Sequence, residues 1–190
     1  MIDAVELILI EWVAKGTVEF FYGSSMFTIS DSVHINAPIE RCFLLSTNIE
    51  LVGRTLGMKP IEGKTSGLIE NGDRLLWAGW KFGFPQIHES LITKYERPVF
   101  FQDTMGRGRF RRFQHDHHLY FMDGRTVLND KLRFTMPFGW LGGLVARFVL
   151  VPHMSRLLRR RMRLLKRVAE SNEWRQYVPD SANLKKGASH

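Results

Sequence analysis

Two aspartates and two histidines in the second half of the chain are the residues best suited to chemistry. His115 and His117 are separated by one residue, so on a β-strand both side chains point to the same face. Asp103 and Asp130 take the same face on the strands expected before and after, so the four groups could line one cavity. Because a buried carboxylate is costly without a partner, and an imidazole is its natural partner, we expect these groups to hydrogen-bond to one another.

Four interpretations of this Asp–His cluster are open. It could be a polar network that fixes the register of a sheet, a set of groups that orient a ligand, or a general acid and base. Metal binding is the fourth, with His115, His117 and a neighbouring carboxylate as ligands. The spacing is not specific for a metal, so we predict neither a metal nor another cofactor, and we assign no catalytic residue.

Alternating apolar and polar residues predict the strands that carry the cluster, over 99–105, 110–122 and 125–136. Apolar residues share the inward face of these strands and would form the walls of the cavity. The predicted ligand-binding set is therefore Asp103, His115, His117, Asp130, Phe101, Phe113, Leu128 and Phe134. On the opposite face, the alternation places Gln114, Asp116 and His118 in solvent.

The segment from Met26 to Ile35 predicts a first strand. Asn36 stands where a helix cap belongs, before Pro38, and predicts a short helix over 37–46. A second short helix is expected over 47–56. Further strands then follow at 58–66, 73–81 and 86–95, and Asn71-Gly72 and Asp123-Gly124 are typical hairpin turns.

A long amphipathic helix is expected near the end of the chain, from Trp140 to about Ser171. Its apolar stripe recurs at spacings of three and four: Leu144, Phe148, Val151, Met154, Leu158, Met162, Leu165 and Ala169. Pro152 predicts a kink near His153 or a break into two helices. A sheet that buries its apolar face against one helix must curl over it and leave a cavity. We therefore predict an α+β fold in which a curved antiparallel sheet of six to seven strands, with two short helices after the first strand, wraps around this helix.

Composition allows one domain: the chain has 190 residues, of which 44% are hydrophobic and 24% charged. Cys42 is the single cysteine, so no internal disulfide can form, and we expect it to be buried on a helix. Residues 1–25 resemble neither a secretory signal nor a membrane span, and a cytoplasmic location is expected. We divide the chain into an extension over 1–25, a domain over 26–172 and a tail over 173–190.

The net charge of +8 is concentrated near the long helix. Residues 131–169 contain no acidic residue and ten basic ones: Lys131, Arg133, Arg147, Arg156, Arg159, Arg160, Arg161, Arg163, Lys166 and Arg167. Arg156, Arg160, Arg163 and Arg167 share the face opposite the apolar stripe. We favour a solvated surface for this face; the alternative is an anionic partner, which could be a membrane, an acidic protein or, less in keeping with the pattern, a nucleic acid.

Several short motifs resemble the SRPBCC superfamily, which groups START domains, polyketide cyclases and relatives, some of them labelled cyclase/dehydrase. They are I-N-A-P-I-E-R-C-F at 35–43, F-F-Q-D at 100–103, G-R-F at 108–110, F-Q-H-D-H-H-L at 113–119, T-V-L-N-D at 126–130 and P-F-G-W-L-G at 137–142. The resemblance implies the helix-grip fold and an apolar cavity. The matching residues are Asp103, Gly108, Phe110, His115, His117 and Asp130, while Arg109 stands where proline is usual.

Two functions follow from the residues and the resemblance. The first is a non-catalytic carrier or sensor that encloses a small hydrophobic or lipid-like molecule, and we prefer it because the cluster contains no recognisable nucleophile arrangement. The second is a cyclase/dehydrase-like or hydrolytic enzyme, in which His115 or His117 acts as base and Asp103 or Asp130 orients it.

Overall fold

Seven antiparallel strands form one sheet in the computed structural model, which describes residues 26–178. The extension 1–25 and the end of the predicted tail lie outside the described residues. The strands lie in the order β1-β7-β6-β5-β4-β3-β2, so each is paired with a neighbour in sequence except where β1 joins β7. Their bounds are β1 (Met26–Ile35), β2 (Met58–Gly63), β3 (Arg74–Lys81), β4 (Phe84–Glu96), β5 (Phe100–Met105), β6 (Arg112–Met122) and β7 (Arg125–Thr135).

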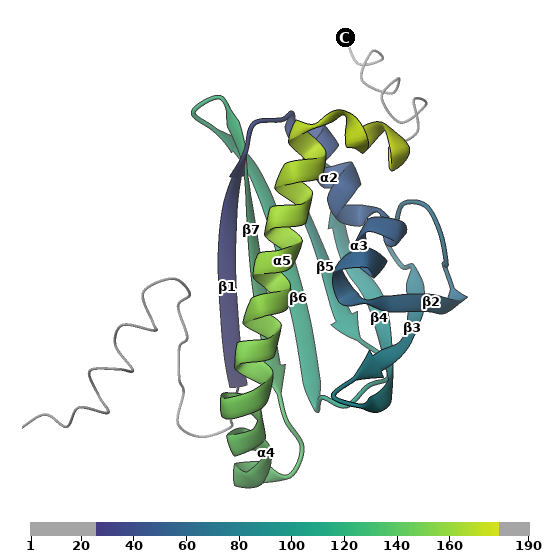
Figure 1. Cartoon of the computed structure of the whole chain (residues 1–190), viewed down its shortest axis with the longest axis vertical. Helices are drawn as coiled ribbons and strands as arrows, with labels where there is room; N and C mark the ends of the chain where they lie inside the picture. Colours follow the sequence, from purple (N-terminus) through teal and green to yellow (C-terminus); the bar gives the residue numbers. More distant parts are fainter. Residues whose placement is uncertain (1–25, 179–190) are drawn as a thin grey trace, which may run out of the picture.

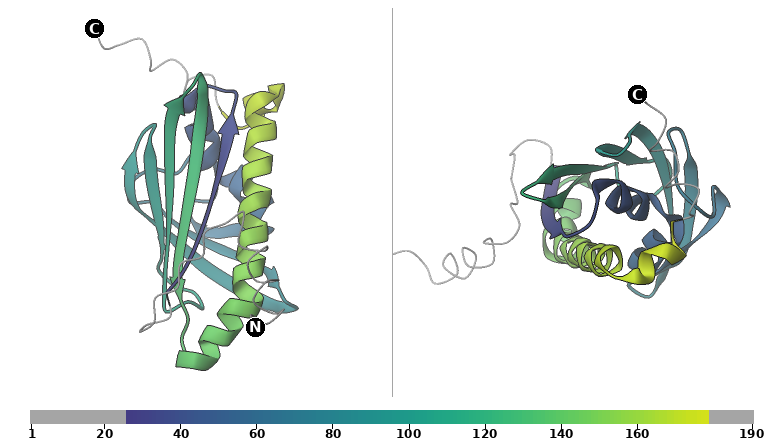
Figure 2. Two further views of the ribbon diagram at one scale, coloured as in Figure 1. Left: turned by 90° about the vertical axis from the view of Figure 1, so that its left-hand side faces the viewer. Right: turned by 90° about the horizontal axis from the view of Figure 1, so that it is seen from above.

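The helices cover the concave face of this sheet. α2 (Ile39–Thr47) and α3 (Ile49–Leu56) follow β1, and the C-terminal helical run consists of α4 (Gly139–Val145), the π-helical turn η1 (Ala146–Leu150) and α5 (Val151–Glu170). A 3₁₀ turn, η2 (Asn172–Gln176), ends the described chain. Figure 1 shows α5 lying along the sheet beside β1, and the view from above in Figure 2 shows the sheet curling around it. The predicted α+β helix-grip architecture is confirmed.

The start of the first helix differs from the prediction. α2 begins at Ile39 with Pro38 as its N-cap, and Asn36 caps nothing; its backbone N–H donates instead to the Glu170 carboxylate, 2.7 Å away. The reason is steric, because a residue before proline is disfavoured in the helical conformation and Ala37 therefore cannot be helical. A side-chain cap does occur on α3, where Asn48 Oδ1 accepts a 2.8 Å hydrogen bond from the Leu51 N–H.

Two hairpins turn through residues with positive φ. Asp123 and Gly124 (φ 51° and 75°) join β6 to β7 as predicted, and Phe82 and Gly83 (φ 54° and 77°) join β3 to β4 in the same manner. Asn71-Gly72 was predicted as a hairpin turn but lies in the longer connection between β2 and β3. Its Gly72 N–H donates to the Ile92 carbonyl on β4, so the turn anchors a loop.

The core lies between α2, α3, α5 and the concave face of the sheet. Phe43, Leu128 and Val168 are fully buried there, from α2, β7 and α5 respectively. Cys42 is buried on α2, as predicted, and burial raises the pKa of its thiol to about 11. The packed chain continues to Val178, which is also buried.

Only the second half of the predicted apolar stripe is buried. Leu158, Met162, Leu165 and Ala169 lie in the core, whereas Leu144 and Phe148 are 47% and 69% exposed. The helical run extends past the end of the sheet, as the lower part of Figure 1 shows, so most apolar side chains of α4 and η1 stay exposed, although Ala146 packs against β1 and β7.

The helical run does not break at Pro152, and its bend lies just before that residue rather than near His153. The π-helical turn comes just before Pro152: the Val151 N–H donates to the Ala146 carbonyl, five residues earlier rather than four. The helical axis bends in this part of the run, as the side view in Figure 2 shows. The wider turn thus accommodates the crowding that proline imposes on the preceding carbonyls.

The outer face of the sheet also differs from the prediction at one residue. His118 is exposed and Gln114 is half-buried, but Asp116 is buried. Its carboxylate accepts hydrogen bonds from Gln102 (2.7 Å) and Gln114 (2.9 Å) and pairs with Arg133. Alternation assigns a residue to a face, but long polar side chains on adjacent strands can still cover it.

The two faces of α5 predict opposite responses to charge substitution. Leu158→Asp places a carboxylate among buried apolar groups and should lower the free energy of unfolding by about 3–5 kcal/mol. Arg160 is exposed, and Arg160→Glu should change the free energy by less than about 0.5 kcal/mol. Urea denaturation of both variants measures this difference. Similar losses would show that the helix faces are assigned wrongly.

Candidate functional site

A cavity of about 510 Å³ lies between the concave face of the sheet and helices α3 and α5. At its inner end the walls are buried side chains, among them Thr47, Leu75 and Phe101. Other lining residues are largely exposed and mark the mouth: Phe82, Phe84, Ile87, Val145 and Val149. The cavity therefore leads from an exposed apolar mouth to a buried interior.

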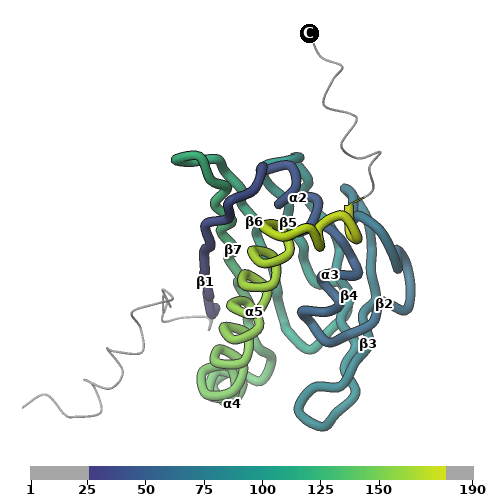
Figure 3. The backbone as a smooth tube through the Cα atoms, turned by 45° about the horizontal axis from the view of Figure 1, so that its top comes forward, coloured from purple at the N-terminus to yellow at the C-terminus, as the bar shows by residue number. Residues whose placement is uncertain are grey.

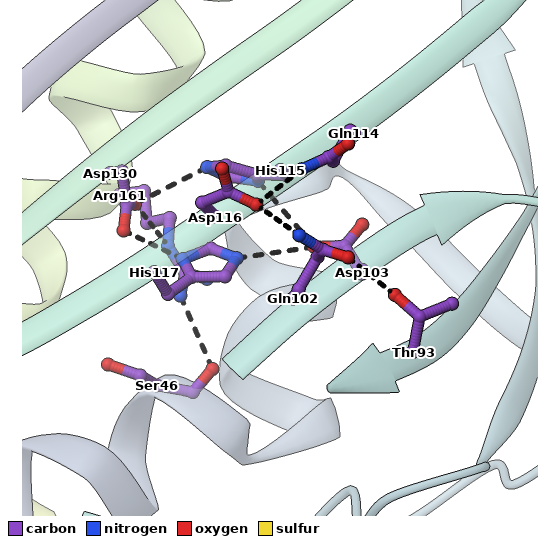
Figure 4. Close-up of polar contacts among 10 residues, drawn as sticks. All are labelled: Ser46, Thr93, Gln102, Asp103, Gln114, His115, Asp116, His117, Asp130 and Arg161. Carbon is purple, nitrogen blue, oxygen red and sulfur yellow. Dashed lines mark hydrogen bonds and ion pairs between the residues drawn. The ribbon is translucent and has the colours of Figure 1, made fainter. Parts of the chain in front are cut away.

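Three strands bring the Asp–His cluster together through their register. His115 lies opposite Asp103 where β5 pairs with β6, and His117 lies opposite Asp130 where β6 pairs with β7. His117 is held on both sides: its Nδ1 is 2.7 Å from an Asp130 oxygen and its Nε2 is 3.2 Å from an Asp103 oxygen. Figure 4 shows the imidazole between the two carboxylates.

Arg161 from α5 completes the cluster. Its Nε donates to the second Asp130 oxygen at 3.1 Å, and its terminal nitrogen donates to the Ser46 carbonyl at the end of α2, 3.3 Å away. The guanidinium is buried, so its charge is balanced by Asp130 rather than by water. One side chain thus joins the long helix, the sheet and α2.

His115 differs from His117 because it has no close hydrogen bond. Its Nδ1 is 3.7 Å from Asp103 and its Nε2 is 3.7 Å from Asp130, both too long for a hydrogen bond. The Nε2 atom is buried without a partner among the described residues. Because His115 lines the cavity, it is the polar group best placed to meet a ligand.

The environment shifts the pKa values of the two histidines in opposite directions. Burial disfavours the charged form of both. For His117 the Asp130 charge and the hydrogen bonds to Asp103 and Asp130 outweigh burial and raise the pKa above 6.5. For His115 burial, assisted by the neighbouring His117 charge, lowers the pKa below 6.5. His117 is therefore the more basic of the two imidazoles, and His115 is neutral near neutral pH.

Both carboxylates remain ionised in this cluster. Burial alone would raise their pKa values, but the His117 and Arg161 charges hold the pKa of Asp130 well below 3.8. A hydrogen bond from His117 and the His115 charge likewise lower the pKa of Asp103. When His117 is protonated, two anions face two cations, Arg161 and His117, and the cluster is neutral.

A metal could use part of the same cluster. One ligand atom from each of Asp103, His115 and His117 lies within 4.8 Å of the others. Asp130 would then orient His117 from behind, as carboxylates do for metal-bound imidazoles. Because Arg161 and His117 already balance the carboxylates, the cluster does not need a metal for charge compensation, and our prediction of no metal remains a prediction.

The structure separates the predicted ligand-binding residues into two groups. Asp103, His115, His117, Phe101 and Phe113 line the cavity. Asp130, Leu128 and Phe134 are buried but are not lining residues: Asp130 acts through His117 and Arg161, and the other two belong to the packed core.

Two of the lining residues that the sequence did not predict interact with the Asp–His cluster. Arg161 was counted with the basic residues, although its position three after Leu158 and four before Leu165 places it on the buried stripe. His88 was not considered, although alternation on β4 puts it on the same face as Ile92. Its ring lies edge-on to Phe113 at 5.1 Å, and burial lowers its pKa.

The comparisons with known proteins address the fold. No protein-family model and no curated protein matches the sequence. The solved structure of the di-domain ARO/CYC StfQ from the steffimycin biosynthetic pathway matches with a TM-score of 0.63 and 12% identity, over 78% of this chain and 52% of that one. Major latex-like protein 151 from Panax ginseng matches with a TM-score of 0.59 and 10% identity, over 77% and 99%.

A third match is a protein from Thermus thermophilus, TTHA0849, with a TM-score of 0.57 and 17% identity, over 74% of this chain and 94% of that one. Fold and site together define a helix-grip protein, in which a curved sheet encloses a cavity against a long helix. These likenesses show the helix-grip fold that the motifs predicted. Identities this low show the fold and leave the function open.

The buried ion pair predicts a large cost for removing Arg161. In Arg161→Leu the Asp130 carboxylate loses its guanidinium, and the free energy of unfolding should fall by about 3–5 kcal/mol. Arg163→Leu, at an exposed position two residues on, is the matched control and should change it by less than about 0.5 kcal/mol. Urea denaturation of the two variants measures the difference, and equal values would contradict the buried pair.

The opposite pKa shifts predict two separate histidine titrations. By NMR, His117 should lose its proton above pH 6.5 and His115 below it, and Asp130→Asn should lower the pKa of His117. The raised pKa of His117 stabilises the fold below pH 6.5, and this contribution is lost as pH rises through its folded value. The lowered pKa of Asp130 stabilises the fold above pH 3.8, and this contribution is lost on acidification. Two titrations near pH 6.5 would refute this assignment.

Proposed function

We propose that the protein binds a small hydrophobic or lipid-like molecule in the cavity and acts as a carrier or sensor. The observation that carries this proposal is the cavity itself: about 510 Å³, walled mainly by apolar side chains, with a polar cluster on one side. Pockets of this volume suit drug-sized molecules, and a few polar groups in an apolar wall fix a ligand's orientation.

The charge balance of the cluster favours a neutral polar group on the ligand. With His117 protonated, Asp103 and Asp130 are matched by Arg161 and His117, so a further buried charge would have no counter-ion. A hydroxyl or carbonyl could instead hydrogen-bond to His115, which lines the cavity and whose ring nitrogens, 3.7 Å from Asp103 and Asp130, make no close hydrogen bond to either carboxylate. Burial of the apolar remainder would provide most of the affinity, at about 25 cal/mol per Å².

The enzymatic alternative rests on the same histidine. His115 lines the cavity, its lowered pKa keeps it neutral near pH 7, and Asp103 lies 3.7 Å from its Nδ1. A neutral imidazole beside a carboxylate can act as a general base on a bound substrate. The likeness in fold to proteins named ARO/CYC is compatible with a cyclase-like reaction, but the cluster shows no recognisable nucleophile arrangement.

Two wider proposals accompany the binding function. A cytoplasmic location is supported by the single cysteine, which is buried and needs no disulfide. An anionic membrane is the proposed second partner, because Arg156, Arg160, Arg163 and Arg167 are all exposed on α5. Apart from Glu170 at its end, this helix has no acidic residue.

Ligand binding can be tested with 2-naphthol, a neutral aromatic alcohol, by the quenching of tryptophan fluorescence, since Trp77 lines the cavity. His115→Leu should weaken binding by about fivefold, the value of one hydrogen bond. His118→Leu, on the outer face, is the control and should bind as the natural chain does. Native mass spectrometry of the purified protein would identify any co-purified molecule.

Absence of both a co-purified molecule and 2-naphthol binding would refute the carrier or sensor. If a co-purified molecule is converted by the natural chain, and His115→Leu binds it but no longer converts it, the enzymatic alternative is correct.

A further inference from the structure

Most of the large apolar side chains that are exposed in the described chain lie at one end of the molecule. From the helical run they include Phe138, Trp140 and Phe148, which are 82%, 74% and 69% exposed. The β3–β4 hairpin adds Trp80 and Phe84, at 70% and 64%. Figures 1 and 3 show α4 and this hairpin at the same lower end. We call these two segments the apolar end.

The apolar end surrounds the mouth of the cavity. Phe82 and Phe84 from the hairpin and Val145 and Val149 from the helical run are exposed and also line the cavity. The Phe82 ring contacts the His153 ring at 4.7 Å, so the hairpin touches the start of α5. A surface that covered this end would therefore also meet the cavity entrance.

The exposed charge at this end is mostly positive, although Arg107 of the β5–β6 turn pairs with Glu62 and Glu89. Residues 74–88, 104–115 and 131–169, which supply the hairpin, the β5–β6 turn and the helical run, contain no acidic residue. Exposed arginines flank the aromatic side chains, namely Arg109, Arg111, Arg112, Arg147 and Arg156. Exposed tryptophan and phenylalanine surrounded by arginine complement the interface of a bilayer that contains anionic lipids.

We propose that the apolar end docks on the surface of an anionic lipid bilayer, so that the cavity mouth faces the lipid interface. Gly139–Glu170 is the one helical run among residues 26–178 long and apolar enough to span a membrane by composition. Its second half, however, packs against the core through Leu158, Met162 and Leu165. The run therefore lies on the membrane with its exposed first half and does not cross it.

This geometry narrows the role of the basic face of α5. Arg156 lies at the apolar end, whereas Arg167 is eleven residues further along the helix, or about 16 Å at the rise of an α-helix. That distance exceeds the screening length of about 8 Å at physiological salt. Arg163 and Arg167 should therefore contribute little to docking, in contrast to the uniform basic face expected from the sequence.

Vesicle sedimentation of the full chain tests the proposal. Vesicles of phosphatidylcholine with phosphatidylserine should bind the protein, and vesicles of phosphatidylcholine alone should bind it more weakly. Added salt should weaken binding to the phosphatidylserine vesicles without abolishing it. The double variant Trp140→Ser/Phe148→Ser should reduce partitioning of the protein onto the vesicles by more than about tenfold. The reason is that the Trp140 and Phe148 side chains of the natural chain would enter the lipid interface. Phe121→Ser, at the opposite β6–β7 end, should have no effect although Phe121 is 62% exposed.

Other outcomes would overturn the proposal. If the protein binds neither kind of vesicle, or if the double variant binds vesicles as well as the natural chain does, the apolar end does not dock on a bilayer. It is then covered by another surface or remains exposed to water. If the natural chain elutes as a dimer in size-exclusion chromatography and the double variant elutes as a monomer, a second copy of the chain occupies the apolar end. Binding of 2-naphthol in the double variant should be unchanged, because neither Trp140 nor Phe148 lines the cavity, so failure of docking and failure of ligand binding can be told apart.

Discussion

The buried ion pair between Arg161 and Asp130 is the interaction on which the rest of the structure depends. It fixes α5 against the middle of the sheet and, through the Ser46 carbonyl, against α2. Without Arg161, two carboxylates would share one buried site with a single imidazolium. In the intact cluster Asp130 hydrogen-bonds to His117, and His117 hydrogen-bonds to Asp103. The packing of α5 against the sheet therefore also influences the protonation of the two histidines. Stability and the electrostatics of the cavity are therefore set by the same contacts.

The cluster also explains why two histidines on one strand have different properties. His117 lies between two carboxylates and shares its face with the Phe101 ring, which stacks on it at 4.0 Å. His115, one pleat away, meets the same carboxylates only at 3.7 Å and faces the cavity. A structural imidazole and an available one thus lie side by side, which suits a pocket that must recognise a polar group without a rearrangement of its core.

The fold could be predicted because its signals are local: alternation gave the strands of the Asp–His cluster, and the spacing of Leu158, Met162 and Leu165 gave the buried helix face. The cluster followed from alternation on three adjacent strands. Arg161 was missed because it was classified by charge rather than by position on the stripe. The exposure of Phe148 could not be seen either, since periodicity does not indicate where the sheet ends. Asp116 shows the same limit, because its burial depends on side chains from two other strands.

The π-helical turn before Pro152 has a consequence for the phase of the helix. A π turn holds one residue more than an α turn, and one residue corresponds to about 100° around the axis. The side chains of α4 are therefore rotated by roughly a quarter turn relative to those they would present if Gly139–Glu170 were a regular α-helix. Loss of a single residue between Ala146 and Leu150 would turn the π turn into an ordinary α turn, and Trp140 would keep nearly the same direction. The π turn thus absorbs one residue of chain without changing the direction in which the surface of α4 faces, whichever residue is the extra one.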